Sequence, residues 1–126
     1  AISQEAISNK EYFIHMSGNA TFKVAVKRMA EVSREALDFN KLSVEDIDLV
    51  LPHQANRRIL DAVSEKLGIP SEKVFMNIEK YGNTSSASIP IAMHEARVAG
   101  LTTPGCLALL VVVGAGLTWG AALIRW

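Results

Sequence analysis

Short apolar segments alternate with amphipathic segments along this chain of 126 residues, and this alternation limits the possible folds more than any other feature. Apolar runs typical of buried strands occur at 12–16, 47–51, 74–78, 107–113 and 118–126. Apolar residues at steps of three and four predict helices at 20–39, across 59–67 with Gly68 as the cap, and at 86–99. The order, strand then helix three times and then two strands, predicts one α/β unit with a mixed sheet and helices on both faces.

The predicted helix at 86–99 has an unusual composition. Small residues dominate it, and charge occurs only near its end, at Glu95 and Arg97. A helix that is small or apolar nearly all round is usually buried on more than one side. The chain is 49% apolar and its mean hydropathy is +0.19, which is high for so small a domain. We therefore expect one face to meet a partner, as in a piece of a longer protein.

Charge and cysteine content exclude several classes. Thirteen basic residues balance thirteen acidic ones, so the net charge predicts no attraction to nucleic acid or to an anionic membrane. The single cysteine excludes an internal disulfide and suits a reducing, cytoplasmic compartment. Three scattered histidines and one cysteine form no zinc pattern. The longest apolar run, 106–113, is far below the ~20 residues that span a bilayer.

Polar clusters follow the first three predicted strands. They are 17–19 (Ser-Gly-Asn), 53–56 (His-Gln-Ala-Asn) and 82–84 (Gly-Asn-Thr). In open α/β sheets, ligands bind beyond the carboxyl ends of the strands. If the strands are parallel, the three clusters share one edge, and that edge is the candidate site.

His53 follows a strand and precedes a helix. A histidine there can donate a ring N–H to an oxygen that gains negative charge, and a helix N-terminus keeps the ring neutral. A capping or core histidine remains the alternative. Taken alone, Asn83 is an ordinary turn residue. His15 and His94 have no metal-ligand partners and are interpreted as structural.

Other candidate nucleophiles and donors give weaker signals. Cys106 begins an apolar strand with no base nearby in sequence, which favours a small hydrophobic role. The serines at 85, 86 and 88 lack the strand-turn-helix elbow of a serine nucleophile. The segment 114–116 (Gly-Ala-Gly) is either a plain hairpin turn or a source of backbone N–H groups for an oxyanion.

Basic residues gather on the first two predicted helices, at Lys23, Lys27, Arg28, Arg34, Arg57 and Arg58. A solvated helix face is the default interpretation. If both helices open onto the same edge, the patch flanks the candidate site and suits an acidic or phosphorylated partner.

Four motifs, in this order along the chain, resemble β-ketoacyl-acyl-carrier-protein synthase III over its C-terminal half. They are Met16-x-Gly18-Asn19-x-x-Phe22-Lys23, Pro52-His53-Gln54-Ala55-Asn56-x-Arg58, Tyr81-Gly82-Asn83-Thr84-Ser85-x-Ala87-Ser88 and Gly114-x-Gly116-x-Thr118-Trp119-Gly120. Together they cover essentially the whole chain, and the set is far more specific than any member.

The resemblance implies half of a thiolase-like fold, in which two similar α/β halves enclose a central layer of helices. It also implies the reaction that starts fatty-acid synthesis. A cysteine of the N-terminal half takes an acetyl group from coenzyme A, malonyl-carrier protein loses CO₂, and its carbanion attacks the acyl thioester. No cofactor is needed, because the carrier protein brings its own phosphopantetheine.

The resemblance also assigns roles to residues. His53 and Asn83 would donate hydrogen bonds to the malonyl thioester oxygen as the enolate forms. Asn19, Phe22, Asn56 and Ala115 would belong to the substrate tunnel and the second oxyanion site. Lys23 and Arg58 would help dock the acyl-carrier protein.

This chain departs from the family pattern in one respect, because no residue matches the acyl-accepting cysteine. We therefore expect residues 1–126 to be the C-terminal domain alone, inactive in isolation. Without its other half, the helix at 86–99 would face water on one side, which predicts self-association into a homo-oligomer. Two alternatives stay open: a starter synthase with another acyl specificity, and a non-catalytic carrier-protein docking or dimerisation module.

Overall fold

The computed structural model of the chain describes residues 3–11, 13 and 18–126. Its helices and strands are, in order, α1 Gln4–Ser8, α2 Gly18–Phe39, β1 Leu49–Pro52, α3 Arg57–Leu67, α4 Ile78–Tyr81, α5 Ser88–Val98, β2 Leu107–Gly114 and β3 Thr118–Arg125. Short 3₁₀ turns occupy Val44–Asp46, Ser71–Lys73 and Ser85–Ala87.

The strands form one mixed sheet in the order β1-β2-β3. β1 runs parallel to β2, with Leu49 opposite Ala108 and Pro52 opposite Val111. β2 and β3 form an antiparallel hairpin that pairs along its whole length, from Leu107 opposite Arg125 to Gly114 opposite Thr118. The predicted mixed α/β architecture is confirmed.

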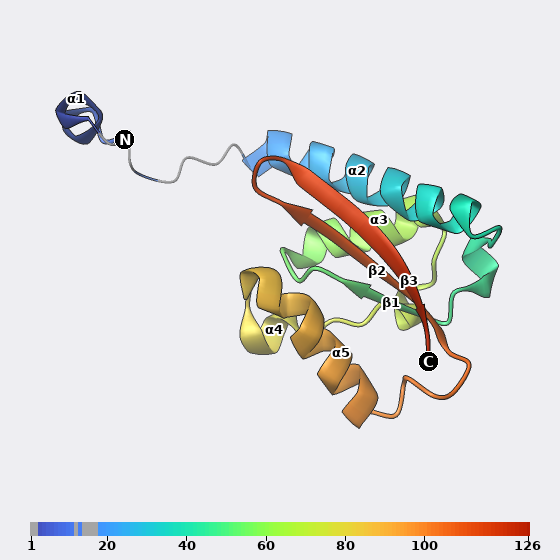
Figure 1. Cartoon of the computed structure of the whole chain (residues 1–126). Coiled ribbons are helices and arrows are strands. Elements are labelled where there is room, and N and C mark those ends of the chain that lie inside the picture. The colour runs from blue at the N-terminus through green and yellow to red at the C-terminus, as the bar shows by residue number, and fades with distance from the viewer. Residues whose placement is uncertain (1–2, 12, 14–17) are drawn as a thin grey trace.

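Helices cover both faces of this sheet (Figure 1). On one face α2 and α3 bury a core that includes Met29, Leu60, Leu109 and Val111. On the other face α5 packs over β1, where Ala92 and Ala96 contact a smaller cluster that contains Leu49 and Leu51. Burial of apolar surface at about 25 cal/mol per Å² drives both layers together.

Local signals explain the helix limits. Asn56 caps α3 by accepting a hydrogen bond from the Arg58 N–H, and Gly68 ends the helix in the left-handed conformation at φ 74°. The start of α2 was predicted two residues late, because Gly18 and Asn19, expected in a turn, form its first turn. Both residues are exposed, so no apolar side chain marks them as helical.

Of the remaining predicted strands, one falls outside the described residues and one is corrected by the structure. The segment 12–16 lies outside the described residues except for Phe13, which is not in a strand. The segment 74–78 is not a strand but makes one parallel bridge, between Val50 and Val74. The ladder stops there because the next hydrogen bond would need an N–H from Pro52, and proline has none.

α5 is buried along one stripe, formed by Ser88, Ala92 and Ala96. Its opposite side faces solvent, with Val98 75% exposed. Within the described residues, α5 is therefore buried on one side only, and its other side faces solvent. In the described part of the chain no helix is long and apolar enough to cross a membrane.

Candidate functional site

The parallel pairing of β1 and β2 brings the loops that follow them to the same edge of the sheet. The beginnings of α2, α3 and α5 and the β2–β3 turn lie at that end of the molecule (Figure 1). A hollow of about 330 Å³ opens there, which we call the His53 hollow. Its lining consists of His53, Ser85, Ser86, Ser88, Ile89, Val112, Val113, Gly114 and Thr118.

His53 is held at this edge by its backbone and its ring. Its N–H donates to the Val111 carbonyl at 2.8 Å, which continues the β1–β2 ladder one residue beyond Pro52. The half-buried ring places Nδ1 2.6 Å from the hydroxyl of Ser88, in the first turn of α5. The side chain therefore joins the sheet to α5 at the wall of the hollow.

Burial lowers the pKa of His53 below its ordinary value of 6.5. Within the described residues no carboxylate hydrogen-bonds to the ring or forms an ion pair with it. A pKa below 6.5 leaves the imidazole mostly neutral at neutral pH, and burial of the ring is the cause. A neutral ring offers one N–H donor and one acceptor.

Asn83 lies beside the hollow in the loop that leads into α5. Its side-chain oxygen accepts a hydrogen bond from the Ser85 N–H at 3.0 Å. Because the oxygen is engaged, the amide nitrogen points its donors elsewhere, and it has no partner among the described residues. Asn83 itself is exposed and not part of the lining, but the neighbouring Ser85 and Ser86 are.

Gln54 was not assigned a role from the sequence, yet it fixes the segment between His53 and Asn83. Its side chain is 1% exposed. The amide nitrogen donates to the carbonyls of Pro52 at 3.0 Å and Phe75 at 3.1 Å. The amide oxygen accepts from the Asn77 N–H at 3.1 Å. Gln54 thus replaces the ladder bond that Pro52 cannot make.

Glu95 is a second residue that the sequence did not reveal as important. Its carboxylate, on α5, accepts hydrogen bonds from Asn77 at 2.8 Å, from the Tyr81 hydroxyl at 2.6 Å and from Lys80. The bond from Lys80, followed by those from Tyr81 and Asn77, lowers the Glu95 pKa to about 2. This cluster fastens α4, and with it the start of the Asn83 loop, to α5.

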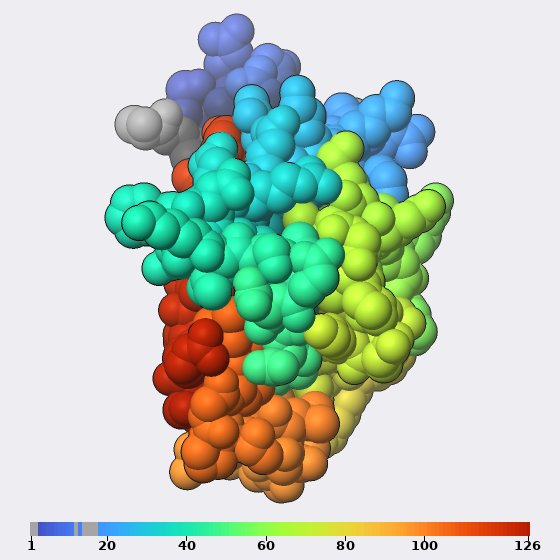
Figure 2. Space-filling model, turned by 90° about the vertical axis from the view of Figure 1, so that its right-hand side faces the viewer, coloured from blue at the N-terminus to red at the C-terminus, as the bar shows by residue number. Residues whose placement is uncertain are grey.

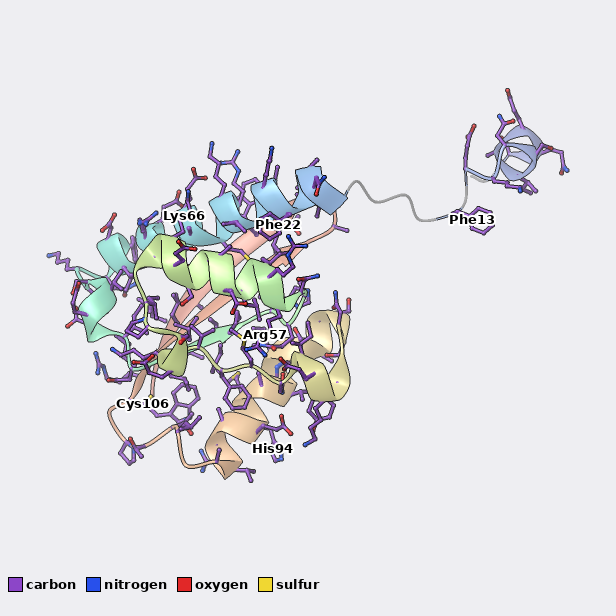
Figure 3. All side chains as sticks on the ribbon, turned by 180° about the vertical axis from the view of Figure 1, so that it is seen from behind. Phe13, Phe22, Arg57, Lys66, His94 and Cys106 are labelled. Carbon is purple, nitrogen blue, oxygen red and sulfur yellow. The ribbon has the colours of Figure 1, made fainter. Side chains whose placement is uncertain are left out.

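The residues predicted to bind substrate or carrier protein surround the same end. Asn19 is exposed in the first turn of α2. The Arg58 guanidinium lies over the Phe22 ring, 5.9 Å from its centroid, and links the N-terminal parts of α2 and α3. Lys23, next to Phe22, is exposed, as is Arg58. Figure 3 shows Phe22 and Arg57 toward this end and Lys66 toward the other.

The β2–β3 turn contributes Gly114 to the hollow, whereas Ala115 is exposed outside the lining. A Cβ at Gly114 would come within 3.2 Å of the Thr118 hydroxyl, and Gly116 adopts φ 142°. Both positions therefore favour glycine. The turn brings backbone, rather than side chains, to the edge of the site.

Cys106 is far from this chemistry. It is 6% exposed, and burial raises the pKa of its thiol. It precedes β2, whereas the hollow lies at the end of β2, about 26 Å away at ~3.3 Å per residue. Figure 2 shows that opposite end, where the segments that follow α2, α3 and α5 lie side by side. The small hydrophobic role predicted for Cys106 agrees with this burial.

The remaining histidines do not join the site. His94 is exposed on α5 (Figure 3), and His15 lies outside the described residues. Among the residues that the structure describes, no group of three or more His, Cys, Asp or Glu side chains could hold a metal ion. The chemistry of the hollow is that of hydroxyls, an imidazole and backbone.

Comparison with known proteins gives a consistent picture. Residues 37–126 match the family model described as 3-oxoacyl-[acyl-carrier-protein (ACP)] synthase III C terminal. The chain is 56% identical over 114 residues to the beta-ketoacyl-[acyl-carrier-protein] synthase III of Aquifex aeolicus, covering 90% of this chain and 37% of the relative. It is 49% identical over 122 residues to the enzyme of that name from Natranaerobius thermophilus, covering 97% and 37%.

Solved structures agree with the fold. The crystal structure of the Aquifex aeolicus synthase III superposes with a TM-score of 0.89 over 90% of this chain and 37% of that one. The Thermus thermophilus synthase III, 51% identical, gives 0.86 over 89% and 35%. The chain spans about a third of the length of these relatives. Its mixed sheet with helices on both faces is thus the C-terminal half of a thiolase-like fold, and the chain belongs to the 3-oxoacyl-[acyl-carrier-protein] synthase III family.

Proposed function

We propose that this chain is the enolate-stabilising half of an enzyme that condenses an acyl thioester with malonyl-carrier protein. The observation that carries the proposal is the neutral, half-buried His53 at the wall of a hydroxyl-lined hollow. The loop of Asn83, with its amide nitrogen unpaired among the described residues, borders the same hollow.

The reaction places one demand on this half. Decarboxylation of malonyl-carrier protein breaks a C–C bond, releases CO₂ and leaves its electron pair as an enolate on the thioester. The His53 ring N–H and the Asn83 amide N–H donate to the thioester oxygen as that charge develops. The carbanion then forms a C–C bond with an acyl group held on a cysteine of the other half, the acyl C–S bond breaks and the cysteine thiolate leaves. The product is a β-ketoacyl-carrier protein, acetoacetyl-carrier protein where the acyl group is acetyl.

Two neutral donors suit this task better than cations. A cation would bind the malonyl carboxylate and thioester oxygen of the ground state as well, and only differential binding of the transition state raises the rate. Burial keeps the imidazole of His53 neutral. Within the described residues, no lysine or arginine lines the hollow.

Variants of the longer protein that contains both halves test the roles. His53→Ala and Asn83→Ala should each lower kcat about 10²–10³-fold, the usual loss for one such donor. His94→Ala is the matched control, because His94 is exposed on α5 outside the hollow. Condensation rates unchanged in His53→Ala would contradict the proposal.

The isolated chain should form no ketoacyl product from acetyl-coenzyme A and malonyl-carrier protein. The nucleophile is absent because Cys106, its single cysteine, is buried at the other end of β2. Mass spectrometry of the carrier protein measures the product. Ketoacyl-carrier protein formed by the pure chain would refute this expectation.

Carrier-protein docking is proposed for the exposed basic residues around Phe22. Arg58 lies over the ring of Phe22, the chain neighbour of Lys23, so two exposed cations occur near the beginnings of α2 and α3, at the end of the molecule that carries the hollow. Charge reversal at Lys23 and Arg58 should weaken the binding of carrier protein to the longer protein that contains both halves. Lys66→Glu, at the far end of α3, is the control. Unchanged affinity in the double reversal would make the patch a solvated face.

A second candidate is a starter synthase with another acyl specificity. The priming β-ketosynthase from the R1128 polyketide biosynthetic pathway is 38% identical to this chain, with a TM-score of 0.80 over 88% of it and 34% of that chain. The condensation rates of the longer protein, which contains both halves, with different acyl-coenzyme A substrates distinguish the candidates. A preference for acetyl-coenzyme A supports fatty-acid initiation.

A further inference from the structure

Ser88 contacts His53 across 35 residues of sequence, and no part of the function proposed above uses it. Its hydroxyl oxygen lies 2.6 Å from His53 Nδ1, and the residue is 2% exposed. A buried hydroxyl proton needs an acceptor. The direction of this hydrogen bond decides which ring nitrogen carries the proton of a neutral imidazole.

Within the part of the chain that the structure describes, no other acceptor competes for the Ser88 hydroxyl. Serines in helices often donate to the carbonyl four residues earlier, as Ser33 does to Met29 at 2.7 Å in α2. Ser88 makes no such bond to Thr84, whose carbonyl accepts from the Ala87 N–H. Among the described residues, Nδ1 is the one partner of the Ser88 hydroxyl.

The two possible directions of the bond are therefore unequal. If Nδ1–H donated to Ser88, the buried hydroxyl proton would have no acceptor within the described residues, and an unsatisfied buried donor disfavours that tautomer. If Ser88 donates to Nδ1, both groups are satisfied and the ring proton lies on Nε2. A carboxylate in place of Ser88 could only accept, and would hold the proton on Nδ1 instead.

We infer that Ser88 is a positioning residue that donates to Nδ1 and so keeps His53 in the Nε2–H form, with that N–H available to the hollow. The inference rests on the proposed function for its purpose, because it supplies the donor that enolate stabilisation needs. The tautomer itself can be measured without substrate.

Long-range ¹H–¹⁵N NMR of the ¹⁵N-histidine-labelled protein, above the ordinary histidine pKa of about 6.5, tests this. The His53 signal is identified by its loss in His53→Gln. In the wild type we expect the proton on Nε2. A wild-type ring protonated on Nδ1 overturns the inference.

Ser88→Ala should raise the ratio of Nδ1–H to Nε2–H about fivefold, the factor that one hydrogen bond of ordinary net strength represents. Ser88→Thr, which keeps a hydroxyl, should restore the wild-type ratio. Ser33→Ala removes another buried serine hydroxyl that does not contact a histidine, and should leave the ratio unchanged. An unchanged ratio in Ser88→Ala overturns the inference. If instead the proposed function were wrong, the His53→Ala variant would condense its substrates at the wild-type rate, whatever the tautomer of His53.

Discussion

Gln54 is the residue on which the geometry between the two proposed donors depends. Pro52 ends the pairing of β1 with the 74–77 segment, and the Gln54 side chain then makes three hydrogen bonds with Pro52, Phe75 and Asn77. Every donor and acceptor of its amide has at least one partner. A buried amide satisfied in this way fixes the backbone on both sides of it.

Gln54→Leu keeps the approximate volume but leaves the Asn77 N–H and the Phe75 carbonyl without this partner. We expect the free energy of unfolding to fall by about 2–4 kcal/mol, because unsatisfied buried groups lose their full hydration. Urea denaturation followed by circular dichroism measures the change. Gln4→Leu, on the exposed side of α1, is the control, and a loss no larger than the control's ~0.5 kcal/mol would contradict the role.

At the scale of single residues, the sequence predicted where the candidate site residues lie along the fold better than it predicted their hydrogen-bond partners. His53 follows its strand as predicted, because apolar patterns locate strands and helices along the chain. The sheet order and the parallel pairing of β1 with β2, which the sequence left as a condition, come from the structure. The sequence did not single out three residues as functional: Ser88, Gln54 and Glu95. Each makes a hydrogen bond to a residue far away in the sequence, at separations of 35, 21 and 18 residues, and no local sequence pattern predicts such contacts. Polar contacts across elements require coordinates.

Among the elements, α4 and α5 are the pair that position the Asn83 loop. The two helices flank that loop, and Glu95 connects them through Lys80 and Tyr81 of α4. Ser85, inside the connecting segment, adopts φ 56°, which costs a non-glycine residue about 1 kcal/mol or more. The loop is therefore held by side-chain contacts rather than by its own backbone preference.

Glu95→Gln should flatten the dependence of stability on pH in acid. The folded-state pKa of Glu95 is about 2, below the ordinary 4.5, so its contribution is present above pH 4.5 and is lost as pH falls toward about 2. Thermal unfolding at several pH values across this window measures the slope. Glu35→Gln, exposed on α2, should keep the wild-type slope. Identical slopes for Glu95→Gln and wild type would refute the role of the cluster.

Element limits were predictable where a cap or an apolar period marks them, as at Gly68 and in the β2–β3 hairpin. The strand predicted at 74–78 was wrong because an apolar run shows that a segment is buried, not that it has a full ladder of partners. Pairing stops after one bridge because Pro52 has no N–H to donate, and Pro52 belongs to β1 rather than to the segment 74–78.

At the scale of the whole molecule, the described helices cover one face of the sheet fully and the other face only in part. We call the partly covered face the open face. α2 and α3 cover one side of the sheet, whereas α5 covers the other side mainly over β1. β2 and β3 are left partly open on the α5 side, where Leu110 and Ile124 are only half-buried and Val112 and Ala122 are exposed. The high apolar content predicted an apolar surface that this chain does not cover, but only the register of β2 and β3 shows which face of the sheet carries it.

The open face should make the isolated chain self-associate, because contiguous exposed apolar surface gains free energy by leaving water. Sedimentation should show a mean mass that rises with protein concentration. Val112→Lys places a charge in the open face and should lower this association. Val24→Lys, on α2, is the matched control, since Val24 is 37% and Val112 36% exposed. A chain that stays monomeric at high concentration, or association weakened equally by both variants, would show that the open face does not drive it.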